Sequence, residues 1–270
     1  MPSATQVERA AVVLHGHVEY LGGALAQLES IAAGRGVELV VVAGDEDAPA
    51  GVDVAIVLGG DGTMLRAMRK FMGTGVPVVG VNFGRVGFLS SIPREELEQG
   101  VDRVFAGEVQ AVELPTLEVQ TGSERFVAVN DAVVTSGELG RMVELEWHVG
   151  GEDLGRVPCD GLICSTPSGS TAYNLSNGGP VLMWGLDAMA ITFVAPHNLH
   201  ARPVVVPRGR DIVVWNRTTD VAVAVLADGH RVAEAAPGGQ VTIRLGEGRS
   251  LLGTLPEATF VRRYRKSFGG

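Results

Sequence analysis

Residues 58–63, LGGDGT, lie between an apolar run and a run of apolar residues at helical spacing. A glycine-rich turn from a strand into a helix is an arrangement that binds phosphate. Its backbone N–H groups can approach phosphate oxygens, and the helix N-terminus adds partial positive charge. Thr63 can donate its hydroxyl hydrogen to the same oxygens. We therefore interpret this segment as a phosphate-binding loop.

Asp61 is the exceptional residue of this loop, because a carboxylate beside bound phosphate is repelled unless it has a chemical role. It can accept a proton from an attacking hydroxyl or help to hold Mg²⁺. The structural alternative makes Asp61 the N-cap of the following helix and the glycines ordinary turn residues. The loop is neither a Walker A loop, because the chain contains no Gly-Lys pair, nor a complete dinucleotide fingerprint, because its third glycine is missing.

A second segment, residues 160–176, reads DGLICSTPSGSTAYNLS. We expect a strand that leads into a turn of small residues and a short helix. Six of the 17 residues are Ser or Thr, and with Tyr173 they form a surface that can hydrogen-bond a ribose and stack on adenine. The alternative is an ordinary Ser/Thr-rich loop. A nucleophilic serine is not expected, because the Gly-x-Ser-x-Gly elbow is missing.

A third candidate is the pair Asn130-Asp131, which follows the apolar residues 126–129. We expect the pair at the end of a strand, facing a cleft. An amide beside a carboxylate suits sugar hydroxyls, because Asn can donate and accept whereas ionised Asp only accepts. The alternative is that both residues continue an edge strand or start a turn.

Residues 10–105 position the glycine-rich loop, and they alternate short apolar runs with helical patterns. This pattern predicts buried parallel strands covered by helices, which is a Rossmann-like α/β arrangement. The predicted strands are residues 11–14, 39–43, 54–58 and 76–81, and the predicted helices contain residues 21–32, residues 64–72 and the residues from Pro93 onward.

From about residue 106 the apolar period changes to two. In residues 143–149 the apolar side chains face one way, and Glu144, Glu146 and His148 face the other. This alternation predicts half-solvated antiparallel strands. The pairs at residues 150–151, 228–229 and 238–239 predict tight hairpin turns. The second half of the chain is therefore expected to be mostly β.

Composition limits the function classes. The 270 residues carry 31 Asp and Glu against 22 Lys and Arg, so a net charge of −9 argues against general nucleic-acid binding. No apolar run approaches the length of a membrane span. Cys159 and Cys164 are the only cysteines, and we interpret them as buried, inert thiols of a cytoplasmic protein.

Together these segments resemble the ordered signature set of NAD kinases. The set comprises the first loop, residues 80–89 (GVNFGRVGFL), Asn130-Asp131, Asp160-Gly161 and residues 169–173 (GSTAY). The resemblance spans nearly the whole chain and includes Pro196-His197, Arg202-Pro203, Asp228-Gly229 and the basic and aromatic ending at residues 265–269. Diacylglycerol and sphingosine kinases share only the first motif, the glycine-rich loop, with this chain.

The resemblance implies an α/β nucleotide-binding domain at residues 1–105 and a β-sandwich-like NAD-binding domain at residues 106–249. The chain end, about residues 250–270, returns to the first domain. It also implies a homodimer or homotetramer. The implied reaction transfers a phosphoryl group from ATP, or from inorganic polyphosphate, to the 2′-hydroxyl of the adenosine ribose of NAD. NADP is the product, and Mg²⁺ or another divalent cation accompanies ATP.

The resemblance also assigns roles to individual residues. Asp61 becomes the general base, and the donor phosphates are positioned by Gly59, Gly60, Gly62 and Thr63. Asn130 and Asp131 hold the acceptor, and Asp160 binds its nicotinamide end. Adenine and its ribose are contacted by Thr171, Ala172, Tyr173 and Ser176, with Phe88 lining the same pocket. Four further residues match positions that make peripheral ligand contacts in the family: Arg66, Arg141, Ala195 and His230.

The chain departs from the family pattern at three positions. The family usually has Glu where Asp131 stands, Thr where Ser168 stands and a basic residue where Pro158 stands. The last departure leaves the nicotinamide end without a basic group, so no preference between NAD and NADH follows. Because the cations expected near the motifs are few, we expect Mg²⁺, held mainly by the donor phosphates, to neutralise the phosphate charge. These cations are Arg66, Arg85, Arg141 and Arg202.

Other candidates have structural interpretations. His197 and His200 have no carboxylate motif nearby, so we expect structural or interface roles rather than metal binding. Residues 262–266 (RRYRK) form a short basic cluster, interpreted as a solvated terminal face that could also steer anionic nucleotides.

Two rival functions have to be weighed. A non-catalytic nucleotide-binding regulator could keep the loop, but binding alone gives no reason for an acid beside phosphates. A lipid kinase would need an apolar entry helix or a basic membrane patch, and neither is evident. We therefore expect NAD and ATP as partners, and neither nucleic acid nor membrane.

Overall fold

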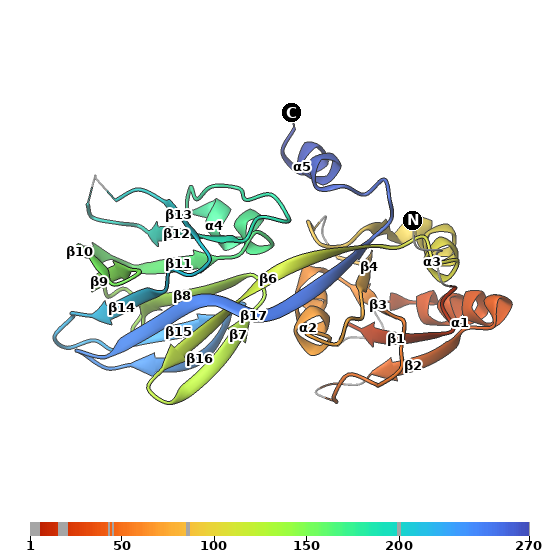
Figure 1. Cartoon of the computed structure of the whole chain (residues 1–270), viewed down its shortest axis with the longest axis horizontal. Coiled ribbons are helices and arrows are strands. Elements are labelled where there is room, and N and C mark those ends of the chain that lie inside the picture. Colours follow the sequence, from red (N-terminus) through yellow and green to blue (C-terminus); the bar gives the residue numbers. More distant parts are fainter. Residues whose placement is uncertain are drawn as a thin grey trace. The chain divides into compact units, whose positions relative to one another are not determined.

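The computed structural model describes residues 6–15, 21–42, 44, 46–84, 87–198 and 201–269. The chain divides into two compact units, Met1–Glu113 with Ser250–Gly270 and Leu114–Arg249. We call them the first unit and the second unit and describe each by itself (Figure 1). The chain enters the second unit within β6 (Gln110–Thr121) and leaves it within β17 (Gln240–Thr254).

A parallel sheet forms the centre of the first unit. Its strands β4 (Val78–Asn82), β3 (Val54–Gly59), β1 (Arg9–Leu14) and β2 (Glu38–Val42) lie in that order. Every residue of β3 is buried, which explains its unbroken apolar sequence. At one edge β4 pairs with β5 (Ile92–Pro93) and with Leu252 of β17. The predicted parallel strands are confirmed; Ala43, the predicted end of the second strand, lies outside the described residues.

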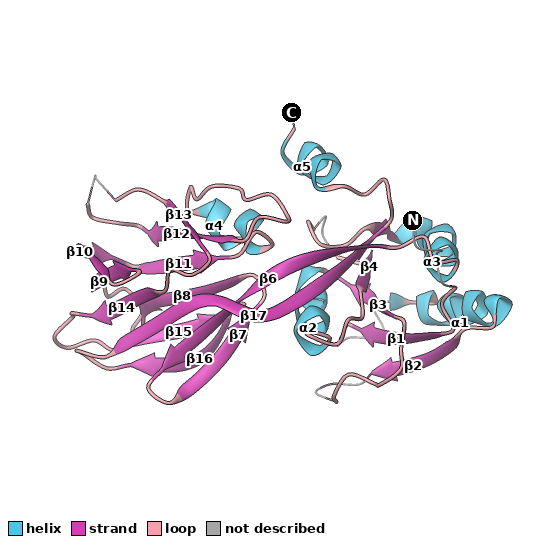
Figure 2. Cartoon of the chain, in the orientation of Figure 1, coloured by secondary structure: helices cyan, strands magenta, loops and turns pink. Residues whose placement is uncertain are grey.

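Figure 2 shows the helices of the first unit; the first three lie in segments with the predicted apolar spacing, and the last was not predicted. They are α1 (Ala24–Arg35), α2 (Asp61–Lys70), α3 (Leu97–Phe105) and α5 (Phe260–Phe268). Helix α1 lies beside α3, and α2 packs on β3 and β4. The helix predicted from Pro93 begins later, because Pro93 has extended backbone in β5 and a 3₁₀ turn, Arg94–Glu96, precedes α3.

The described part of the second unit is built from strands in two sheets. One contains β10 (Glu152–Cys159), β9 (Val143–Val149), β14 (Ile212–Asn216) and β17 in that order. In the same sheet β6 pairs with β17, and β7 (Glu124–Ala128) pairs with β6. The other is antiparallel, in the order β13 (Val204–Pro207), β12 (Ala188–Val194), β11 (Gly161–Ser165), β8 (Asp131–Ser136), β15 (Val223–Ala227) and β16 (His230–Ala235).

Both sheets of the second unit contribute side chains to one apolar core, as in a β-sandwich. Leu145 and Ile243 come from one sheet, and Leu162 and Val225 come from the other. The expected fold class, an α/β part followed by a β-sandwich-like part, is confirmed. No helix formed by the described residues is both long and apolar enough to cross a membrane.

Two of the three predicted hairpin turns are confirmed, at residues 150–151 and 228–229. The prediction at residues 238–239 is wrong, because this turn connects β16 to β17, which lie in different sheets. One strand face is also less solvated than its sequence indicates. Gly150 and Gly151 connect β9 to β10 and both have positive φ, as such tight turns require. Glu146, on the face of β9 predicted to be solvated, is only 9% exposed. Arg217 and Arg156 approach its carboxylate to 2.8 and 3.0 Å. Hydrogen bonding by Arg217 lowers the pKa of Glu146 to about 2.

Candidate active site

The glycine-rich loop joins β3 directly to α2. Gly59 is the last residue of β3, Gly60 is the N-cap and α2 begins at Asp61. A Cβ at Gly59 would lie 2.5 Å from Oγ1 of Thr63, so a larger residue there would displace Thr63. Around Gly62 the space is open to 4 Å among the described residues. The loop therefore leaves Gly62 accessible at the N-terminus of α2, whereas Thr63 is buried beneath it.

The carboxylate of Asp61 is held by backbone amides from residues that follow β4. Phe88 N donates to Oδ2 at 2.8 Å, and Leu89 N donates to Oδ1 at 3.3 Å. The N-cap alternative for Asp61 is wrong, because Gly60 occupies that position and no side chain caps the helix. An ionised carboxylate has about four acceptor positions, so Asp61 keeps capacity for a further proton or ligand.

Glycines in the segment after β4 allow this contact. A Cβ at Gly87 would lie 2.1 Å from Oδ1 of Asp61, and a Cβ at Gly84 would lie 3.3 Å from Cα of Gly60. The two glycine-rich segments thus pack against each other in the first unit. Arg85 and Val86, which complete the second motif, lie outside the described residues.

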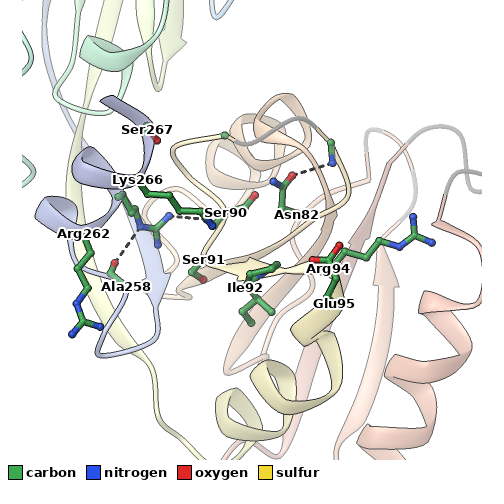
Figure 3. Close-up of a pocket in the computed structure, with 14 residues that line it drawn as sticks. Asn82, Ser90, Ser91, Ile92, Arg94, Glu95, Ala258, Arg262, Lys266 and Ser267 are labelled. Atoms are coloured by element: carbon green, nitrogen blue, oxygen red, sulfur yellow. Dashed lines mark hydrogen bonds between the residues drawn. The ribbon is translucent and has the colours of Figure 1, made fainter. Parts of the chain in front are cut away.

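A basic pocket of about 340 Å³ lies beside this contact in the first unit (Figure 3). Its wall includes Gly84 and Gly87, which touch the first loop. Four cationic side chains and one carboxylate line its described part, together with serine hydroxyls. The charged residues are Arg94, Arg262, Arg263, Lys266 and Glu95. The excess of positive charge makes this pocket suitable for an anion.

The basic cluster at residues 262–266 is only partly a solvated face, because Arg263 is 9% exposed. Helix α5 packs aromatic residues against Phe88, with ring centroids 5.3 Å away for Phe260 and 6.1 Å for Phe268. Phe88 itself is buried. The spacing Phe260, Tyr264, Phe268 was the available signal for an amphipathic helix, and sequence reasoning missed it. The lining of a nucleotide pocket by Phe88 stays a prediction.

In the second unit, Asn130 and Asp131 are held by a carboxylate from a hairpin turn. Asp228, between β15 and β16, accepts backbone N–H bonds from Val129 at 2.9 Å, Asn130 at 2.7 Å and Asp131 at 3.3 Å. Its φ of 49° is unusual for a residue other than glycine. Asp131 begins β8 and is 6% exposed. Burial, and secondly the charge of Asp228, raise the pKa of Asp131 to about 7.

The Ser/Thr-rich segment forms a 3₁₀ turn, Gly169–Thr171, and the short helix α4, Tyr173–Ser176. Most of its hydroxyls are buried and bond to the protein itself, contrary to the expected nucleotide-facing surface. Thr166 donates to Val129 O at 2.7 Å, and Ser168 donates to Oδ1 of Asn130 at 2.8 Å. These bonds are possible because the segment crosses the chain close to Asn130. The hydroxyls thus order the loop.

The four residues expected to contact adenine and ribose remain accessible in this segment. Tyr173 is 44% exposed, Ser176 is exposed, and Thr171 and Ala172 are half-buried. Gly169 lets the segment approach Asn130, because a Cβ there would lie 2.2 Å from the carbonyl oxygen of Asn130. The structure therefore brings these four residues to the same end of β11 as Asn130 and Asp131.

Other predicted residues lie at the far end of β11. Asp160 precedes this strand, and Gly161 pairs with Val194, the neighbour of Ala195. One five-residue strand thus separates Asp160 from the Asp131 end, roughly 17 Å at the usual rise. Asp160 and Ala195 are exposed, and Ala195 has a φ of 43°. His230 lies by the Asp131 end, with Nδ1 3.0 Å from the carbonyl oxygen of Asp228.

The predicted peripheral arginines have protein partners. Arg66 donates to the carbonyl oxygen of Leu14 at 2.8 Å in the first unit. Arg141 is exposed and pairs with Asp220 at 2.7 Å. Cys159 and Cys164 are buried as free thiols, as predicted, and burial raises the pKa of Cys159 to about 12. His200 lies outside the described residues, among which no group of three His, Cys, Asp or Glu could hold a metal ion.

Comparisons with known families cover most of the chain. The ATP-NAD kinase N-terminal domain matches residues 24–109, and the ATP-NAD kinase C-terminal domain matches residues 129–252. The NAD kinase of Heliobacterium modesticaldum is 38% identical over 80% of this chain and 78% of the relative. That of Symbiobacterium thermophilum is 36% identical over 92% of this chain and 89% of the relative.

Solved structures give the same result for the fold. Yeast NADH kinase complexed with NADH superposes with a TM-score of 0.84 and 21% identity, over 98% of this chain and 88% of that chain. An NAD kinase from Archaeoglobus fulgidus in complex with ATP has a TM-score of 0.74 and 30% identity, over 97% of each chain. Because both family domains match and relatives 36–38% identical cover most of its length, the chain belongs to the NAD kinase family of enzymes.

Proposed function

We propose that the chain transfers the γ-phosphoryl group of ATP to the 2′-hydroxyl of the adenosine ribose of NAD, with Asp61 as the general base. The observation that carries this proposal is the Asp61 carboxylate, held by two backbone amides at a helix N-terminus beside a basic pocket. Asp61 accepts the 2′-hydroxyl proton while the ribose oxygen bonds to the γ-phosphorus. The bond from that phosphorus to the bridging oxygen breaks, and ADP leaves with its electron pair.

The first unit is proposed to bind the donor. The backbone of Gly59, Gly60 and Gly62 and the N-terminus of α2 would position its phosphates, and Thr63 would support the loop from beneath. Arg262 and Lys266 of the basic pocket would neutralise part of the phosphate charge. Phosphate oxygens are ligands that Mg²⁺ prefers, so a divalent cation would come with ATP and neutralise further charge. Inorganic polyphosphate is an alternative donor.

The second unit is proposed to bind NAD. Asn130 and Asp131 would hold ribose hydroxyls, while Tyr173 would stack on adenine with Thr171, Ala172 and Ser176 around it. Asp160, at the far end of β11, would contact the nicotinamide end. The separation of Asp160 from Asp131 by one strand supports this division, because NAD is an elongated molecule with adenine and nicotinamide at opposite ends.

The test is a direct assay. The protein is incubated with ATP, Mg²⁺ and NAD, and NADP is measured with a dehydrogenase specific for NADP. Parallel reactions replace ATP by polyphosphate and NAD by NADH. Formation of NADP by the parent protein, and its loss in the Asp61→Asn variant, would support the proposal. If no donor gives product while NAD still binds, the chain is instead a nucleotide-binding regulator.

We further propose a homo-oligomer in the cytoplasm. The free, buried cysteines suit a reducing compartment. Strand β13 forms an edge of its sheet and exposes Val204 and Val205, an apolar edge of the kind that a second copy covers. Light scattering should give a mass of at least two chains, and Val205→Lys should lower it. A parent protein that stays a monomer at micromolar concentration would contradict the assembly.

A further inference from the structure

A buried arginine of α5 touches the residues that hold Asp61. Nη1 of Arg263 donates to the carbonyl oxygens of Phe88 at 2.9 Å, Leu89 at 2.8 Å and Ser90 at 2.9 Å. Nε donates to the carbonyl oxygen of Ala258 at 3.1 Å. Dashed lines in Figure 3 mark the bonds to Ala258 and Ser90. Arg263 therefore holds the backbone of residues 88–90 from the side of α5.

One peptide group connects Arg263 to Asp61. The carbonyl oxygen of Phe88 accepts from Arg263, and the N–H of the same peptide group, that of Leu89, donates to Asp61. A cation at the carbonyl oxygen polarises the peptide, which strengthens the hydrogen bond that its N–H donates. The guanidinium thus acts on the orientation of Asp61 through the backbone.

Arg263 stays protonated although it is buried. Burial lowers the pKa of its guanidinium to about 10, and the negative charge of Asp61 opposes that lowering. The side chain is therefore cationic near neutral pH. Three carbonyl oxygens of residues 88–90 compensate this charge, and the guanidinium in turn fixes the position of that backbone segment.

We propose that Arg263 is a positioning residue for phosphoryl transfer, which holds the Phe88–Leu89 peptide so that its amides keep the Asp61 carboxylate in place for proton acceptance. The inference rests on the proposed role of Asp61. It predicts a change in turnover rather than in substrate binding, because misplacing a catalytic group by about 1 Å can cost about 10²-fold in rate.

The test compares two substitutions at Arg263 with one elsewhere on α5. Arg263→Met removes the charge and the bonds but keeps much of the packing, and Arg263→Lys keeps the charge but lacks the planar fork. Arg265→Met is the matched control, because Arg265 is exposed on the same helix and loses the same charge. Steady-state kinetics are measured for NAD and ATP well below each melting temperature and normalised to folded protein.

We expect Arg263→Met to lower kcat by about 10–100-fold, with both KM values within about twofold of the parent. Arg263→Lys should lie between the parent and Arg263→Met, and Arg265→Met should match the parent. A folded Arg263 variant with the kcat of Arg265→Met would overturn the inference, as would a change confined to KM. Should Arg263→Met not fold, the kcat of Arg263→Lys decides in the same way.

A double-variant cycle separates this inference from the proposed function. If Arg263 acts through Asp61, Arg263→Met should reduce the residual rate of Asp61→Asn by no more than about twofold. A further loss as large as in the parent background would show that Arg263 acts independently of Asp61, and would refute the inference. If Asp61→Asn alone keeps the kcat of the parent, the general-base role fails first, whatever Arg263 does.

Discussion

Asp61 begins helix α2 in the first unit and Asp131 begins strand β8 in the second unit, and their carboxylates have different neighbours. Backbone amides of Phe88 and Leu89 donate to the carboxylate of Asp61. The backbone N–H of Asp131 itself donates to the carboxylate of Asp228. Burial, and secondly the charge of Asp228, raise the pKa of Asp131 to about 7. Burial and neighbouring groups, rather than the residue type, therefore decide what each carboxylate contacts: Asp61 receives two backbone N–H donors, whereas Asp131 lies beside the carboxylate of Asp228.

The largest effect should come from Asp61. We expect Asp61→Asn to lower kcat by about 10²–10⁴-fold, the usual loss on removing a general base, because the amide cannot take the hydroxyl proton. Binding of NAD, measured by calorimetry, and the melting temperature should change little. Turnover close to that of the parent would show that another group accepts the proton, and Asp61 would then differ from Asp131 in its contacts but not in a catalytic role.

A pH effect on stability should follow from Asp131. Its pKa is raised in the folded state, so the protonated form contributes stability below about pH 4, and this contribution is lost as the pH rises through about 7. The loss amounts to at most about 4 kcal/mol. Asp131→Asn lacks this titration, so its melting temperature relative to the parent should increase from pH 4 to pH 8. Parallel pH curves for the two proteins would show that Asp131 ionises normally.

A kinetic test of Asp131 distinguishes acceptor binding from catalysis. We expect Asp131→Ala to raise KM for NAD by roughly 10–150-fold, equivalent to about 1.5–3 kcal/mol for a hydrogen bond to a charged group, with KM for ATP little changed. Asp131→Glu should retain measurable activity, because the carboxylate remains and only its position shifts. Saturation curves for both substrates give the answer, and an NAD curve that overlays the parent would refute the acceptor-binding role.

The smallest effect is expected at Tyr173. Its exposed ring should stack on adenine, so Tyr173→Ala should weaken NAD binding by about 1–3 kcal/mol, whereas Tyr173→Phe should keep most of the affinity. Calorimetric titration with NAD measures both variants. Equal dissociation constants for the parent and Tyr173→Ala would leave the exposed ring without a role in the nucleotide site.

Patterns among neighbouring residues predicted the fold class and the ends of the elements that carry the motifs. The apolar run before Gly59 and the helical spacing from Met64 to Met72 placed the loop between β3 and α2. The Asp228-Gly229 pair predicted its hairpin turn, where φ is positive at both positions. Such signals are local, because burial periodicity and turn conformation depend on residues only a few positions apart.

The tertiary structure decided what the polar residues of the motifs contact. The sequence alone determined that Asp61 follows two glycines at the start of a helix, but the amides that hold it come from residues 27 and 28 positions away. Arg263 reaches the same backbone from 175 positions away, in a cluster whose composition indicated a solvated face. Hydroxyls such as that of Thr166 likewise bond across 37 positions rather than facing solvent. Such partners depend on which distant segments the packed core brings together, and a buried polar group must find them there because no water is available to replace them.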